Sequence, residues 1–74
     1  MLPKRLRVHS GKDVCGILSK HGFVKIRQKG SHVVMQKSIY QSTITVVVPD
    51  HNELQVGTLQ SVIRQSGIPR SEFE

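Results

Sequence analysis

The residues best suited to chemistry lie in one short stretch, Arg27-Gln28-Lys29-Gly30-Ser31-His32. An imidazole ordinarily titrates at about pH 6.5, so at neutral pH it can accept or donate the protons that move during phosphodiester cleavage. Attack of an RNA 2′-hydroxyl on its own phosphate needs a base, an acid for the leaving oxygen, and positive charge around the phosphorus. We interpret His32 as the candidate acid or base, acting without a metal or other cofactor.

Groups that suit an anionic phosphate surround this histidine in the sequence. Lys25, Arg27 and Lys29 are cations, while Gly30 offers a backbone N–H and Ser31 a hydroxyl. We expect these five residues to bind RNA. Ordinary interpretations stand beside this one, because glycine often marks a plain hairpin turn and a lone strand histidine is often structural or simply on the surface.

The remaining histidines and the one cysteine give weaker signals. His51 is a possible second acid or base, although a loop histidine can equally hydrogen-bond its own turn. Metal ligands usually come as closely spaced pairs or with carboxylate clusters. Neither pattern occurs around His9, Cys15, His21, His32 or His51. The sequence therefore predicts no metal site.

The central stretch is expected to form a β-hairpin. A Lys29–Gly30 turn is preferred because glycine tolerates the positive φ of such turns, and a three-residue loop ending at Ser31 is the alternative. The preferred register places Arg27 opposite His32 on a cationic sheet face. Lys25 then lies opposite Val34 on that face. The apolar residues expected to gather on the opposite face are Val24, Ile26, Val33 and Met35.

Hydrophobic periodicity predicts one α+β domain over residues 10–74, preceded by a basic lead-in, residues 1–9, that is either a solvated tail or a phosphate-touching arm. The expected elements, in chain order, are a helix over about 11–21, strands over 23–28, 31–37 and 43–48, a helix from 57–58 to Gly67, and a final turn over 71–74 that packs Phe73. Three antiparallel strands with two helices on one face leave the other sheet face open. This α-β-β-β-α order is that of the double-stranded-RNA-binding domain.

Charge favours a polyanionic partner. The chain has 74 residues and a net charge of +6, and residues 1–37 hold nine of the eleven Lys and Arg residues with one acid. Such a basic half suits nucleic acid, although a merely soluble basic surface is the alternative. No apolar run approaches the roughly 20 residues of a membrane span, and Cys15 has no partner for an intrachain disulfide. We therefore expect a cytoplasmic protein with no membrane contact.

The sequence resembles the HicA-type toxins of toxin–antitoxin pairs over about residues 10–73. The matching residues, in order, are Ser10-Gly11-Lys12-Asp13-Val14, Gly22-Phe23, Arg27-Gln28-Lys29-Gly30-Ser31-His32, Val48-Pro49, His51-Asn52, Glu53-Leu54, Gly57-Thr58-Leu59, Ile63-Arg64-Gln65, Gly67 and Glu72-Phe73.

This resemblance implies a double-stranded-RNA-binding-like fold and an endoribonuclease, an mRNA interferase that cleaves mRNA and halts translation. It implies that His32, in the Gly-Ser-His motif, is the catalytic residue. The implied partners are mRNA and a HicB-type antitoxin that covers the active site. We expect the free toxin to be monomeric and to form a higher assembly with the antitoxin. Two other hypotheses remain open, a non-catalytic RNA-binding module and a plain interaction subunit that binds only the antitoxin.

Overall fold

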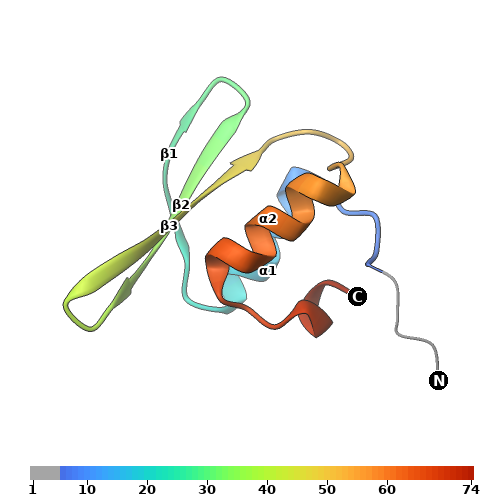
Figure 1. The fold of residues 1–74 in the computed structure, drawn as a ribbon. Coiled ribbons are helices and arrows are strands. Elements are labelled where there is room, and N and C mark those ends of the chain that lie inside the picture. Colours follow the sequence, from blue (N-terminus) through green and yellow to red (C-terminus); the bar gives the residue numbers. More distant parts are fainter. Residues whose placement is uncertain (1–5) are drawn as a thin grey trace.

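The chain folds in the order helix, strand, strand, strand, helix, and a computed structural model describes it over residues 6–74. The elements are α1 (Gly11–Lys20), β1 (Val24–Lys29), β2 (His32–Ile39), β3 (Ser42–Pro49), α2 (Val56–Ser66) and a terminal 3-10 helix, η1 (Arg70–Phe73). The strands form one antiparallel sheet in the order β1-β2-β3. Both helices lie on the same side of this sheet (Figure 1). The predicted α+β, α-β-β-β-α architecture is thus confirmed.

Local sequence signals explain where α1 begins and ends. Ser10 accepts a hydrogen bond from the Asp13 N–H at 3.0 Å, and the Asp13 carboxylate accepts one from the Ser10 N–H at 3.1 Å, which completes a capping box. At the other end, the Phe23 N–H donates to the Leu18 carbonyl at 3.0 Å and Gly22 adopts a φ of +93°. This is a Schellman motif, which turns the chain and buries Phe23 under the helix.

The hydrophobic core lies between the helices and the inner face of the sheet. Buried side chains alternate along the strands, at Val33 and Met35 of β2 and at Val46 and Val48 of β3. The helices and loops complete this core with Val14, Leu18, Phe23, Leu54, Leu59, Val62, Ile68 and Phe73. The outer sheet face is left open. Within residues 6–74, no helix has the length and hydrophobicity needed to cross a membrane.

The end of the lead-in packs on the C-terminal 3-10 helix. His9 is buried, and its Nε2 lies 2.8 Å from the Phe73 carbonyl oxygen. The same oxygen accepts a hydrogen bond from the Arg7 N–H at 3.2 Å. Phe73 is fully buried, as predicted from the sequence. Residues 1–5 of the predicted basic lead-in lie outside the described part of the chain.

The predicted hairpin register is wrong. The turn residues are Gly30 and Ser31, so Lys29 pairs with His32, and Arg27 pairs with Val34 rather than with His32. Gly30 has a φ of +57°, which suits the first central position of a type II′ turn. Neither the Lys29–Gly30 turn nor the three-residue loop is therefore present.

A β-bulge moves the side chains of β1 between sheet faces. The pairing shifts between Lys25 and Arg27, which leaves Ile26 as the extra residue. Lys25 consequently pairs with Met35 on the inner face, whereas Val24 and Ile26 are 61% and 49% exposed. The expected separation of apolar and charged residues on β1 is therefore wrong as well.

The second turn is tighter than the sequence suggested. Residues 38–42 were expected to connect two shorter strands, but β2 and β3 continue to a two-residue turn of Tyr40 and Gln41. The resulting hairpin projects beyond the helices, and Tyr40 at its tip is 89% exposed (Figure 1).

Candidate functional site

His32 lies at the first position of β2, on the open face of the sheet. The following residue, Val33, is buried on the inner face, and side chains of a strand alternate between faces. His32 is exposed and has two cross-strand neighbours, Lys29 of β1 and Pro49 of β3. An exposed imidazole therefore stands beside a lysine at the turn-proximal end of the sheet.

Two of the three predicted cations share this face with His32. Lys29 is directly opposite it, and Arg27 lies in the next row, paired with Val34. Lys25 is on the inner face because of the bulge, so the expectation that it would lie with Arg27 and His32 is wrong. Positive charge on the open face therefore comes from Lys29 and Arg27.

Hydrogen bonds connect the segment after β3 to the turn that precedes His32 and to α1. The Asp50 N–H donates to the Ser31 carbonyl at 2.6 Å, and the Gly11 N–H of α1 donates to the His51 carbonyl at 2.8 Å. His51 is exposed and follows Pro49, the partner of His32, by two residues. Two exposed histidines thus lie at the same end of the sheet.

The two turn residues expected to contact phosphate are both exposed. The carbonyl of Gly30 accepts a hydrogen bond from Gln28 Nε2 at 3.1 Å, and the Ser31 carbonyl accepts from Asp50. These bonds hold the turn from both sides. The Gly30 N–H and the Ser31 hydroxyl are the groups through which the turn can bind an anion.

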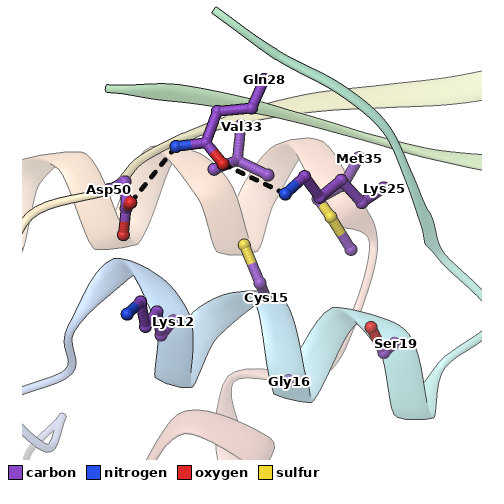
Figure 2. A pocket seen from close by; sticks show the side chains of 9 residues that line it. All are labelled: Lys12, Cys15, Gly16, Ser19, Lys25, Gln28, Val33, Met35 and Asp50. Atoms are coloured by element: carbon purple, nitrogen blue, oxygen red, sulfur yellow. Dashed lines mark hydrogen bonds between the residues drawn. The ribbon is translucent and has the colours of Figure 1, made fainter. Parts of the chain in front are cut away.

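A pocket of about 280 Å³ lies on the other side of the hairpin, between α1 and the inner face of β1 and β2. Its lining consists of Lys12, Cys15, Gly16, Ser19, Lys25, Gln28, Val33, Met35 and Asp50 (Figure 2). Lys25 Nζ donates to Gln28 Oε1 at 3.1 Å, and Gln28 Nε2 donates to Asp50 Oδ2 at 3.3 Å. This chain of hydrogen bonds forms the upper rim of the pocket.

The sequence analysis missed this pocket. Reading β1 with a strict alternation puts Lys25 and Arg27 on one face, and nothing in the local sequence marks a bulge between them. The bulge brings Lys25 onto the inner face beside Gln28, and this creates the polar rim. The only signal in the sequence was Lys12, a cation at the start of α1 on the helix face that lines the pocket.

Two ionisable side chains near the site have shifted pKa values. Burial raises the pKa of the Cys15 thiol, and the negative charge of Asp50 raises it further. The thiol is therefore protonated at neutral pH and contributes an apolar surface to the pocket. Hydrogen bonds from the Ser10 backbone and hydroxyl lower the pKa of Asp13, which keeps the capping carboxylate ionised.

Taken together, fold and site define an α-β-β-β-α domain with an open sheet face that carries an exposed histidine and two cations. A family model described as "HicA toxin of bacterial toxin-antitoxin" matches residues 11–68. The chain therefore belongs to the HicA toxin family, and the resemblance stated from the sequence is confirmed. A HicA toxin is one half of a toxin–antitoxin pair, so a partner antitoxin is expected for this chain. Comparison with curated proteins gave no match.

Proposed function

We propose that this HicA toxin is an mRNA endoribonuclease in which His32 transfers the proton at the attacking 2′-hydroxyl. The observation that carries the proposal is the position of His32, exposed at the end of β2 and directly opposite Lys29. Arg27 in the adjacent row adds a second cation for the phosphate. Neutral imidazole is a competent base at cellular pH, and preorganised cations stabilise the charge that develops on the phosphorane.

The reaction is a transesterification within the RNA. His32 accepts the 2′-hydroxyl proton as O2′ attacks phosphorus, and the bond from phosphorus to the 5′ oxygen of the next nucleotide breaks. Protonation of that leaving oxygen yields a 2′,3′-cyclic phosphate and a free 5′-hydroxyl. We assign this second proton to His51, which is exposed at the same end of the sheet. The step needs neither a metal ion nor another cofactor.

The test is cleavage of a defined mRNA by the purified protein in EDTA. Wild-type protein is expected to cut, and His32→Ala to cut at least about 100-fold more slowly, since a positioned acid or base typically contributes that much. His21→Ala is the matched control, because His21 caps the far end of α1 and bonds Glu72 at 3.0 Å. Equal cleavage by His32→Ala would contradict the mechanism. Salt-sensitive RNA binding without any products would instead favour the non-catalytic RNA-binding module.

The partner proposal follows from the open sheet face. Val24, Ile26 and Val47 are 61%, 49% and 46% exposed, beside the two cations of the site. We propose that a HicB-type antitoxin covers this face with acidic and apolar groups, and that the free toxin is a cytoplasmic monomer. Light scattering on the free chain and on its complex measures the two oligomeric states. Reversal of charge at Arg27 and at Lys29 should weaken the complex. A complex indifferent to both reversals would argue against it.

A further inference from the structure

The pocket between α1 and β1 lies on the opposite side of the hairpin from the proposed cleavage site and has no role in the proton transfers. Val33 lines its wall and directly follows His32 in β2, so the pocket and the His32 side chain lie on opposite faces at the same end of the hairpin. Gln28 in its rim bonds the carbonyl of Gly30, the turn residue that precedes Ser31 and His32. An RNA strand passing around the hairpin turn can therefore contact His32 on one face of the hairpin and the pocket on the other.

The pocket lining suits a flat ring that carries polar groups at its edge. Val33 and Met35, 6% and 1% exposed, form an apolar floor from the sheet, and the protonated Cys15 thiol faces them from α1 (Figure 2). The volume of about 280 Å³ is just below that of drug-sized sites, which span about 300–1,000 Å³. A single aromatic base fits these dimensions.

Polar groups at the rim suit a nucleotide rather than another aromatic ligand. Asp50 lines the pocket and accepts from Gln28 through Oδ2, and a carboxylate can also accept from a ring N–H or an exocyclic amine of a base. Lys12 and Lys25, both exposed at the mouth, match the negative phosphates on either side of a bound base. Gln28 donates to both Gly30 and Asp50, so it braces the rim.

We infer that this pocket binds one unpaired nucleobase of the RNA next to the phosphate held at His32, and so contributes to the choice of cleavage site. The inference rests on the proposed function for the identity of the ligand. Single-stranded RNA is generally recognised through bases that are splayed out of the stack and inserted between side chains.

Gly16 allows the pocket to be filled without disturbing the fold. It is an exposed residue of α1 that lines the pocket, and a Cβ built on it meets nothing within 4 Å. Gly16→Leu therefore places an isobutyl group in the mouth of the pocket. Gly57→Leu is the matched control, since Gly57 is also helical, exposed and open within 4 Å, but belongs to α2 and does not line the pocket.

The experiment first maps the position at which wild-type protein cuts a single-stranded RNA. Binding is then measured with RNAs that carry 2′-deoxyribose at the cut, which removes the attacking hydroxyl, and an abasic residue at each neighbouring position in turn. One abasic position is expected to weaken binding by wild-type and Gly57→Leu about tenfold, near the lower end of the range for a stacked base, because no aromatic ring lines this pocket. Gly16→Leu should bind all of these RNAs with one common, weaker affinity.

Alkylation of Cys15 gives a second readout, because it is the only cysteine and lies in the pocket. Intact RNA should slow its reaction with iodoacetamide, and the RNA with the critical abasic position should not. If Gly16→Leu distinguishes the abasic RNAs as wild-type does, the pocket assignment is overturned. If wild-type cuts no RNA, the proposed function fails, and the same binding comparison still decides the pocket assignment when abasic residues are placed at successive positions of an RNA without 2′-deoxyribose.

Discussion

At the scale of single residues, the hairpin carries two groups of polar side chains on opposite faces. His32, Lys29 and Arg27 share the open face, while Lys25 and Gln28 face α1. Only the first group can act on a phosphate lying on the open face. We propose His51 for the second proton transfer, and its backbone carbonyl accepts a hydrogen bond from the Gly11 N–H of α1.

The role of His51 as the acid predicts a specific rescue. His51→Ala should cut ordinary RNA about 100-fold more slowly. An RNA with sulfur in place of the leaving 5′ oxygen should restore its rate, because a thiolate leaves without being protonated. His32→Ala should stay slow on both substrates, and Asn52→Ala, a change in the neighbouring exposed residue, should behave as wild-type. Cleavage rates on the two RNAs measure this, and an unrescued His51→Ala would exclude the assignment.

At the scale of elements, the position of α1 against the end of β3 depends on one close backbone approach. Gly11 is buried, and a Cβ at this position would collide with the Pro49 carbonyl oxygen. The Gly11 N–H meanwhile bonds His51. Because Gly11 has no side chain, the start of α1 can contact the end of β3, where Pro49 pairs with His32.

Two glycine-to-alanine changes in α1 should consequently have opposite signs. Gly11→Ala should lower the free energy of unfolding by about 1–3 kcal/mol, the usual range for overpacking. Gly16→Ala should raise it by about 1 kcal/mol, because alanine is the better helix former and the site is open. Urea denaturation monitored by circular dichroism measures both. Stabilisation by Gly11→Ala would show that the helix start is not in tight contact with Pro49.

At the scale of the whole molecule, the two ends of the described chain stabilise one another. The Phe73 carbonyl oxygen accepts a hydrogen bond from the Arg7 N–H and lies 2.8 Å from His9 Nε2. The Phe73 ring is fully buried. The His9 and Phe73 rings pack edge to face with centroids 6.1 Å apart. A chain of 74 residues has a small core, so one such aromatic carries a large share of its stability.

Truncation of Phe73 should therefore be costly. Phe73→Ala is expected to lower the free energy of unfolding by about 3–5 kcal/mol, as for other buried aromatics. Phe73→Leu should show a smaller loss and provides a folded reference. Tyr40→Ala, at a position 89% exposed, should change the free energy by less than about 0.5 kcal/mol. Urea midpoints of the three variants test this, and a near-neutral Phe73→Ala would mean that η1 is not part of the core.

The sequence alone determined the order of elements, the caps of α1, the buried face of β2, and a histidine after a glycine turn. These features follow from the spacing of apolar residues and from side chains that hydrogen-bond the free N–H groups at a helix start. Each can therefore be predicted from a few neighbouring residues. Only the tertiary structure decided the Gly30–Ser31 turn, the bulge at Ile26 and hence the pocket beside α1. A bulge is fixed by how β1 packs against β2 and α1, and a single extra residue reverses every side chain beyond it.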